Sequence, residues 1–289
     1  MQQENSDYVL AVDLGTSGPK VALATLDGKI IASQVGSNDV IMLPGGGAEQ
    51  DPDDWWRAIK EATHELLAAA PVEKEAIKAI CCTTQWSGTV PVDKAGNHLT
   101  NAIIWLDSRG GPYVPRYTGG GIKVEGYGLY NLFTWIRLTG GIPDLPGKES
   151  IAHIWYLKHE RPEIYEAAYK FLEPKDYLNM RLTGIAAASY DSITVHWVTD
   201  NRDINNIVYS EQLLEWADVP RDKLPDLKSS VDILGPLKPD IAAELGLGED
   251  VQVIMGTPDI HSAAVGSGGI RDFEPHIYIG TSSWISCHV

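Results

Sequence analysis

The stretch AVDLGTSGPKVALATLDGKIIAS, residues 11–33, decides the fold prediction. Residues 20–26 and 29–35 are rich in small and β-branched apolar side chains, which is typical of β-strands. Asp27-Gly28 between them is a common two-residue hairpin turn. The Gly-Thr-Ser-Gly loop at residues 15–18 also follows an apolar strand. The sequence therefore predicts three antiparallel strands, with this loop joining the first two.

The loop matches neither of two common phosphate-binding patterns. A Walker loop requires glycine five positions after Gly15, where this chain has Lys20. A dinucleotide-binding loop opens a helix, whereas this loop is followed by a strand. An acidic residue, Asp13, and a lysine nevertheless flank the loop, and this pairing points to another kind of phosphate site.

Composition and charge exclude several classes of partner. The 289 residues carry a formal net charge of −16, and no cluster of Lys and Arg offers a surface for nucleic acid. The three cysteines have no zinc or disulfide spacing, which is typical of a reducing compartment. No signal peptide and no apolar stretch of membrane-spanning length is evident. We expect a cytoplasmic protein that binds neither nucleic acid nor membranes.

Further elements extend the first three strands into an α/β domain. Asp51-Pro52 begins a helix, with an Asp cap, Pro in the first turn and acidic residues beside the positive end of the helix dipole. Residues 76–83 and 102–106 read as buried strands, and so do residues 251–255. A helix is expected over residues 260–268. This order of elements predicts a mixed sheet.

The middle of the chain, at about residues 110–225, has a different character. It is rich in Gly, Pro and aromatic residues at first, and helices are expected over residues 151–169 and 210–217. We interpret it as a large insertion into the α/β domain.

The glycine-rich loop has a second copy near the end of the chain. Leu14-Gly15-Thr16-Ser17 and Ile279-Gly280-Thr281-Ser282 share one pattern, an apolar strand followed by Gly-Thr-Ser and a second strand. Such a repeat indicates a duplicated fold, in which both turns offer N–H groups and hydroxyls to one phosphate chain. Asp13 would hold Mg²⁺ through water beside the first turn.

Five motifs, in this order along the chain, resemble those of the FGGY carbohydrate kinases, the xylulose kinases most and glycerol kinase more distantly. The resemblance implies two ribonuclease-H-like domains, the ATPase superfold of actin and hexokinase, closing on ATP and a sugar or polyol. It implies a sugar-binding domain at residues 1–268 and, at residues 269–289, the start of a truncated nucleotide-binding domain. The motifs are Asp13-Leu14-Gly15-Thr16-Ser17, Glu49-Gln50-Asp51-Pro52 with Trp55-Trp56, Trp105-Leu106-Asp107-Ser108-Arg109, Pro174-Lys175-Asp176-Tyr177-Leu178 and Gly280-Thr281-Ser282.

The resemblance also implies a role for each motif residue in ATP-dependent phosphorylation of a hydroxyl group. Asp259, in Gly-Thr-Pro-Asp after a strand, takes the position of the catalytic base, which accepts the proton of the attacking hydroxyl. The resemblance leaves a homodimer open. The expected ATP-binding residues are Asp13, Gly15, Thr16, Ser17, Lys20, Gly280, Thr281 and Ser282, with Asp13 also serving Mg²⁺, and the expected sugar-binding residues are Gln85, Trp86, Ser87, Trp105, Asp107 and Arg109.

Three departures from the xylulose kinases concern the sugar. Gln85-Trp86-Ser87-Gly88 stands in place of Gln-Met-His-Gly, Ile260 in place of Asn or Gln, and His153 in place of Lys. Loss of polar partners changes discrimination among polyhydroxy substrates strongly. We therefore expect a deoxysugar or short alditol to be preferred over D-xylulose.

The last departure is the end at Val289, where family members continue through the domain that holds adenine. We expect an N-terminal portion that binds ATP poorly and is inactive alone. Two other functions stay open: a non-catalytic or degenerate sugar-binding kinase half, and a nucleotide hydrolase of the same superfold. A hydrolase gives no reason for Trp86, Trp105 and Asp259 to converge.

Overall fold

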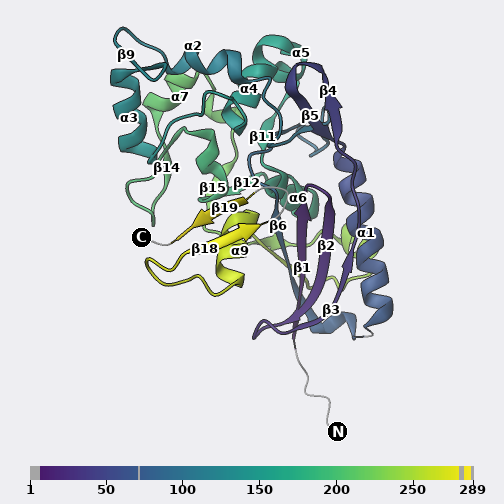
Figure 1. Ribbon diagram of the computed structural model, residues 1–289. Helices are drawn as coiled ribbons and strands as arrows, with labels where there is room; N and C mark the ends of the chain where they lie inside the picture. Colours follow the sequence, from purple (N-terminus) through teal and green to yellow (C-terminus); the bar gives the residue numbers. More distant parts are fainter. Residues whose placement is uncertain (1–6, 71, 280–282, 288–289) are drawn as a thin grey trace.

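The computed structural model describes residues 7–70, 72–279 and 283–287, and a six-stranded mixed sheet forms its centre (Figure 1). The three N-terminal strands form an antiparallel meander, as the sequence predicts. Residues 77–84 pair in parallel with the first strand, and residues 252–254 pair in parallel with residues 77–84. Residues 233–236 pair antiparallel with residues 252–254 and form the edge of the sheet. In spatial order the strands are β16 (Ile233–Pro236), β17 (Gln252–Ile254), β6 (Ile77–Thr84), β1 (Tyr8–Gly15), β2 (Gly18–Thr25) and β3 (Ile30–Val35).

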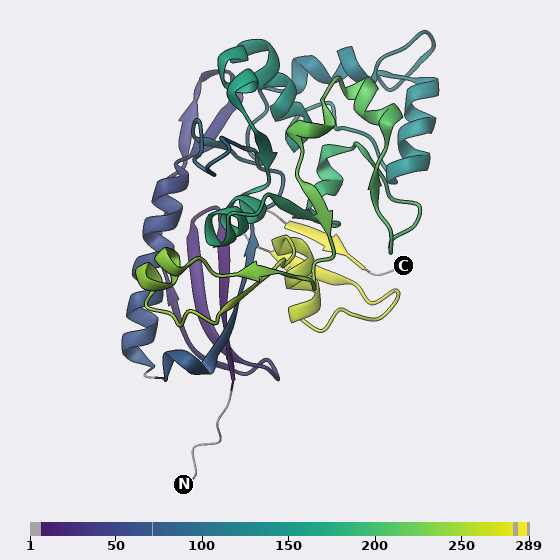
Figure 2. The same cartoon turned by 180° about the vertical axis from the view of Figure 1, so that it is seen from behind.

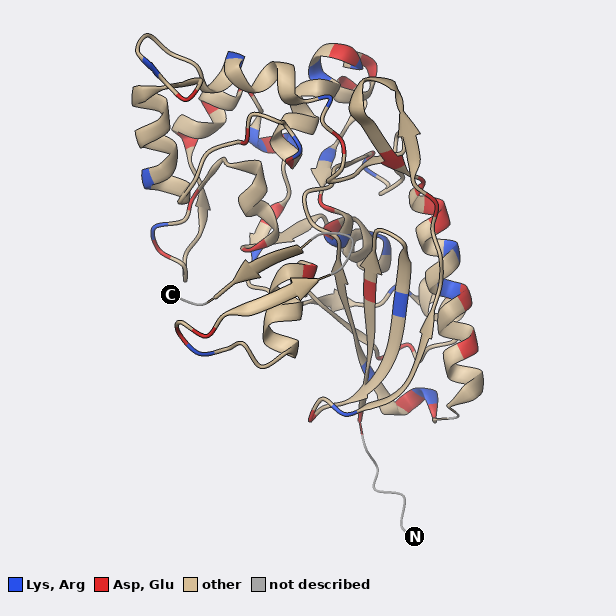
Figure 3. Ribbon diagram, viewed as in Figure 1, with Lys and Arg blue, Asp and Glu red and all other residues tan. Residues whose placement is uncertain are grey.

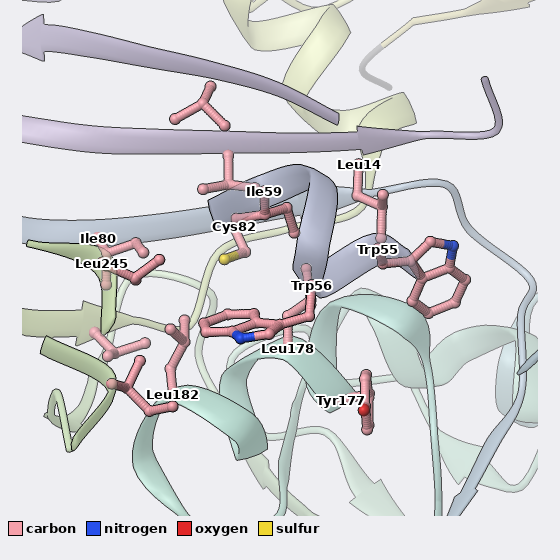
Figure 4. Close-up of a cluster of buried hydrophobic side chains, with 14 of the residues drawn as sticks. Leu14, Trp55, Trp56, Ile59, Ile80, Cys82, Tyr177, Leu178, Leu182 and Leu245 are labelled. Atoms are coloured by element: carbon pink, nitrogen blue, oxygen red, sulfur yellow. The ribbon is translucent and has the colours of Figure 1, made fainter. Parts of the chain in front are cut away.

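One face of this sheet carries the main hydrophobic core. Because side chains alternate along a strand, β1 directs its fully buried leucines and valine to this face. Helices α1 (Pro52–Ala69), α6 (Pro174–Thr183) and α8 (Pro239–Leu245) cover it. Figure 4 shows side chains from these elements interdigitating, among them Leu14, Trp55, Trp56, Ile59, Ile80, Cys82, Tyr177, Leu178, Leu182 and Leu245.

Helix α1 begins as the sequence predicts. The carboxylate of Asp51 accepts a hydrogen bond from the backbone N–H of Asp53 at 2.9 Å, and Pro52 follows in the first turn. α6 lies behind the sheet in Figure 1 and in front of it in Figure 2, which shows the molecule from the other side.

The opposite face of the sheet is more open and holds polar groups. Asp13 of β1 lies directly across from Lys20 of β2 and beside Thr83 of β6. Helix α9 (Asp259–Gly266) packs on this face, where the hydroxyl of Ser262 donates to the hydroxyl of Thr83 on β6 at 3.0 Å. The register of three strands thus brings a carboxylate and an ammonium group under the start of α9.

A second hydrophobic cluster forms the helical part at the upper left of Figure 1. It is built around buried aromatic side chains such as Trp135 and Trp155. α6, although inside the range expected for an insertion, packs on the sheet instead. The domain boundaries stay a prediction. The helices of this part are α2 (Val114–Thr118), α3 (Leu129–Thr139), α4 (Ser150–Glu160), α5 (Pro162–Ala167) and α7 (Glu211–Ala217).

Two elements differ from expectation. The helix expected over 151–169 is broken into α4 and α5 at Arg161, because Pro162 has no N–H to continue the hydrogen-bond ladder. The strand expected over 102–106 is only two residues long, because the chain turns after Ile104, where Asp107 N–H donates to its carbonyl at 2.8 Å.

Short strands complete the fold. The C-terminal hairpin of β18 and β19 is antiparallel, as expected, whereas its predicted loop at Gly280, Thr281 and Ser282 lies outside the described residues. The short strands are β4 (Ile41–Leu43), β5 (Gly47–Gln50), β7 (Val90–Val92), β8 (Ala102–Ile103), β9 (Lys123–Val124), β10 (Tyr127–Gly128), β11 (Lys170–Leu172), β12 (Ala187–Ser189), β13 (Thr199–Asp200), β14 (Val208–Tyr209), β15 (Asp226–Lys228), β18 (His276–Ile279) and β19 (Ser283–Ser286).

Charged side chains of both signs are spread over the elements, as Figure 3 shows. Within the part of the chain that the structure describes, no helix is both long and apolar enough to cross a membrane.

Candidate active site

A cavity of about 440 Å³ opens where the β1–β2 turn, the loop after β6 and the start of α9 meet. It brings together nine of the residues that the sequence predicts for a site, and it also includes Ile260. Asp13, Asp107 and Arg109 do not line it. The nine are Gly15, Thr16, Ser17, Lys20, Gln85, Trp86, Ser87, Trp105 and Asp259.

The tight β1–β2 turn depends on glycine at position 18. Its φ is +144°, and a Cβ there would lie 2.3 Å from the carbonyl oxygen of Gly36. Because the turn spans only Thr16 and Ser17 between paired glycines, Asp13 and Lys20 face each other and form an ion pair at 2.8 Å. The hydrogen bond to Asp13 raises the pKa of Lys20. A turn with a lysine ammonium beside it is suited to an anion.

Thr16 anchors the turn to two other walls of the cavity. Its hydroxyl accepts a hydrogen bond from Trp105 Nε1 at 2.9 Å and donates one to Gln85 Oε1 at 3.2 Å. The amide nitrogen of Gln85 in turn donates to Gln50 Oε1 at 2.6 Å. Gln50 closes the circuit by donating to the carbonyl oxygen of Thr16 at 2.8 Å.

This network clarifies the place of Gln85 and adds a residue that sequence reasoning missed. Both polar ends of Gln85 are engaged by protein groups, and its side chain is only 2% exposed. Gln50 is fully buried and joins the turn to the loop after β6. The sequence feature that could have indicated Gln50 is its position next to the α1 cap, in the motif Glu49-Gln50-Asp51-Pro52. Whether Gln85 touches a ligand stays a prediction.

The loop carrying Trp86 and Ser87 is held in one conformation. Ser87 has φ +60°, and a Cβ on Gly88 would lie 2.6 Å from Pro174. Trp86 Nε1 donates to the carbonyl oxygen of Ser192 at 3.1 Å, and its ring lies edge-to-face with His261 at 5.3 Å. Trp86 is therefore fixed as a wall of the cavity.

Asp259 stands at the start of α9, after a turn pressed against β6. Gly256 in this turn has φ +68°, and a Cβ there would lie 2.1 Å from the carbonyl oxygen of Cys82. The pKa of Asp259 is raised to about 6, mainly by burial and also by the charge of Asp13, while the hydrogen bond from Ile260 N–H and the charge of Lys20 oppose the rise. A carboxylate with a pKa close to neutral is suited to accept a proton at physiological pH.

Asp107 and Arg109, predicted to bind the sugar, lie outside the cavity and pair with each other. Asp107 is fully buried and accepts hydrogen bonds from the N–H of Ala48 at 2.9 Å and from Arg109 Nε at 2.8 Å. Arg109 also forms an ion pair with Glu49 at 2.6 Å and donates to Tyr156 at 3.0 Å. These contacts brace the loop that carries Trp105; contact with a substrate stays a prediction.

His153 lies behind the cavity rather than in it. It is completely buried, its Nδ1 lies 3.3 Å from the hydroxyl of Thr89, and burial lowers its pKa to about 4. The imidazole is therefore neutral at physiological pH.

Among the residues that the structure describes, ligands for a cation are offered by Asp13 and by a group of three side chains on another part of the surface. Asp13 is partly exposed, and Lys20 engages its Oδ2, so the other oxygen can accept from a metal-bound water. Asp51, Asp53 and His98 have ligand atoms within 4.8 Å of one another. None of these three lines the cavity, and Asp53 already pairs with Arg181 at 3.2 Å.

Comparison with known proteins finds clear similarity over almost the whole chain. Residues 8–266 match the family described as "FGGY family of carbohydrate kinases, N-terminal domain". A xylulose kinase from Bacillus subtilis (strain 168) is 32% identical over 283 residues, which are 96% of this chain and 53% of that protein. The chain spans about half the length of the curated relatives it matches.

Solved structures agree on the fold. A ligand-bound xylulose kinase from Lactobacillus acidophilus superimposes with a TM-score of 0.83 at 22% identity, covering 96% of this chain and 54% of that one. A glycerol kinase from Plasmodium falciparum with ADP gives 0.82 at 21% identity, covering 97% and 54%. These likenesses confirm the predicted ribonuclease-H-like fold class.

Proposed function

The chain belongs to the FGGY family of carbohydrate kinases, as the motifs suggested, and from this premise we propose that its cavity binds a small sugar or polyol for phosphorylation by ATP. The observation that carries the proposal is the meeting of Asp259 and Lys20 in one cavity. One group accepts a proton and the other attracts phosphate. Phosphoryl transfer needs both, together with accurate positioning of the nucleophile.

In this proposal Asp259 acts as the general base. The attacking hydroxyl of the sugar passes its proton to Asp259 Oδ2, since Oδ1 already accepts from the N–H of Ile260 at 2.9 Å. The raised pKa keeps the carboxylate basic enough to take the proton, while most of it is ionised at neutral pH.

ATP supplies the phosphoryl group when it is bound. The N–H groups and hydroxyls of the β1–β2 turn and the ammonium of Lys20 would hold phosphate oxygens, and Asp13 would hold Mg²⁺ through water. The residues fit such a role, because the exposed ammonium group of Lys20 pairs with a carboxylate that is only partly buried. Gly280, Thr281 and Ser282 would add a second phosphate turn.

The sugar would lie against Trp86 and Trp105. Ser87 is short and Ile260 is apolar, so this wall offers few hydrogen bonds to hydroxyl groups. Indole faces favour the C–H surface of a carbohydrate. We therefore propose a deoxysugar or short alditol as the preferred acceptor over D-xylulose, because a buried hydroxyl without a partner costs about 1–3 kcal/mol.

The test is the variant Asp259→Asn in the full-length protein. Turnover should fall by about 10²–10⁴-fold while sugar affinity changes little, as expected for loss of a general base. Asp250→Asn, an exposed acid before β17, is the matched control and should behave as wild type. A change of less than about threefold in turnover of Asp259→Asn would remove this residue from the mechanism.

Turnover of ATP by the wild-type protein, measured with and without sugar, separates the kinase from the other two functions. A nucleotide hydrolase would release phosphate from ATP without sugar, and a degenerate sugar-binding half would bind sugar without any transfer. Either result would replace the kinase proposal.

A further inference from the structure

One motif has no role in the cavity itself. Pro174-Lys175-Asp176-Tyr177-Leu178 forms the start of α6, and its apolar members Tyr177 and Leu178 pack in the main core. Its charged members Lys175 and Asp176 form an ion pair and are 1% and 0% exposed. A buried ion pair adds little to stability compared with apolar side chains of similar size. Its presence inside a helix that already packs well calls for another explanation.

The lysine side of this pair holds the turn that carries Asp259. Lys175 Nζ and Asn179 Nδ2 both donate to the carbonyl oxygen of Met255, at 3.1 and 2.8 Å. Met255 is the last residue before the turn that begins at Gly256, and all three side chains are buried. Two donors from α6 therefore hold the backbone at Met255, where the turn that leads to Asp259 begins.

The aspartate side of the pair leads to Trp86. Asp176 Oδ2 accepts a hydrogen bond from the hydroxyl of Ser192 at 2.7 Å. The carbonyl oxygen of Ser192 is the acceptor for Trp86 Nε1. Glu173, one residue before α6, secures the same loop by accepting from the N–H of Gly88 at 3.0 Å.

We propose that Lys175, Asp176, Asn179 and Ser192 are positioning residues that hold Asp259 and Trp86 in fixed relation across the cavity. Lys175 and Asn179 form one branch, which positions the turn before Asp259. Asp176 and Ser192 form the other branch, which positions Trp86, and the ion pair between Lys175 and Asp176 joins the two branches. The inference rests on the proposed function for its kinetic meaning, but the geometry can be tested without any activity.

Hydrogen exchange of the backbone amides tests the two branches separately. Asn179→Leu should speed exchange in residues 255–260 by about three- to tenfold, the effect of one lost buried hydrogen bond, and leave residues 85–88 unchanged. Ser192→Ala should do the reverse. Thr183→Val is the matched control, because the Thr183 hydroxyl donates only to Asn179 O within α6 and accepts from Ile185 N–H. It should change neither segment.

Lys175→Met, if it folds, should loosen both segments, and the two single-branch variants keep the test informative if it does not. Equal acceleration of both segments in Asn179→Leu and Ser192→Ala, or acceleration in neither, would overturn the proposal. The same holds if Thr183→Val matches them.

Kinetics of the full-length protein supply the second readout. Asn179→Leu should lower kcat by about tenfold with the sugar KM within about twofold, whereas Ser192→Ala should raise the sugar KM by about tenfold with little change in kcat. Parallel losses in both constants that follow the melting temperature would indicate a merely structural role and overturn the proposal. A wild-type protein that phosphorylates no sugar would defeat the proposed function alone, and hydrogen exchange would still decide the positioning.

Discussion

The raised pKa of Asp259 predicts the pH dependence of the reaction. With a pKa of about 6 instead of 3.8, roughly one-tenth of Asp259 is ionised at pH 5 and roughly nine-tenths at pH 7. If the ionised form is the base, kcat/KM should fall by about tenfold between these two pH values. An ordinary aspartate would still be more than roughly nine-tenths ionised at pH 5, and the rate would hardly change.

Two charged neighbours of Asp259 should shift the pH midpoint of this fall in kcat/KM in opposite directions. Lys20→Met removes a positive charge that lowers the pKa of Asp259, so the midpoint should rise. Asp13→Asn removes a negative charge that raises this pKa, so the midpoint should fall. Both residues are proposed to bind phosphate or Mg²⁺, so the rates drop as well. The quantity to compare is therefore the pH midpoint of kcat/KM and not its maximal value.

The assay is direct measurement of ADP formed, from about pH 4.5 to pH 8, without coupling enzymes that have their own pH dependence. Asp250→Asn should leave the midpoint where it is in wild type. A wild-type midpoint at or below about pH 4.5 would refute the assignment of the base, and so would a shift in the same direction for Lys20→Met and Asp13→Asn.

Stability gives an independent check with a defined sign. The folded-state pKa of Asp259 lies above its ordinary value, so the contribution of this group to stability is complete below about pH 3.8 and is lost as the pH rises through about 6. Asp259→Asn should therefore unfold at a higher temperature than wild type at pH 8, and the difference should narrow as the pH falls toward about 4.

Three further predictions concern the ion pair of Arg109 with Asp107, the loop after β6 and the choice of substrate. Arg109→Met should destabilise the fold by about 3–5 kcal/mol in urea titrations, since it leaves Asp107 buried without its partner; a loss under about 1 kcal/mol would contradict this. Gly88→Ala should lower stability by about 1–3 kcal/mol, because its Cβ would lie 2.6 Å from Pro174; a neutral change would show that the loop relaxes freely. A panel of pentuloses, tetritols, pentitols and deoxysugars should rank D-xylulose below the best substrate in kcat/KM, and a lead of about tenfold for D-xylulose would reverse our reading of Ser87 and Ile260.

Local signals in the sequence predicted the elements that depend on neighbouring residues. The three-stranded meander and the Asp51 cap act over a few residues, and the structure has both where expected. The hairpin at Asp27-Gly28 also forms, but its loop is longer than the predicted two residues, because β2 ends at Thr25 and β3 begins at Ile30. The break at Pro162 was missed because the apolar spacing continues across it.

Contacts between distant segments were beyond such signals. Gln50 and Gln85 are 35 positions apart and meet only because β5 and the end of β6 converge beside the β1–β2 turn. Lys175 and Met255 are 80 positions apart. The motif containing Lys175 was visible in the sequence, but its partner is a backbone carbonyl, which leaves no trace in side-chain identity.

The short turn at Thr16-Ser17 links the fold to the chemistry. With period-two alternation, β1 buries Leu14 and turns Asp13 to the open face of the sheet. Because only two residues separate the paired glycines of β1 and β2, Lys20 falls directly opposite Asp13 on that same face. A turn longer by one residue would shift β2 by one place and exchange its faces, sending the lysine toward the core. The length of the loop thus places an ammonium group within the cavity of Asp259, and this placement, rather than the glycine-rich composition, makes the loop a phosphate site in our proposal.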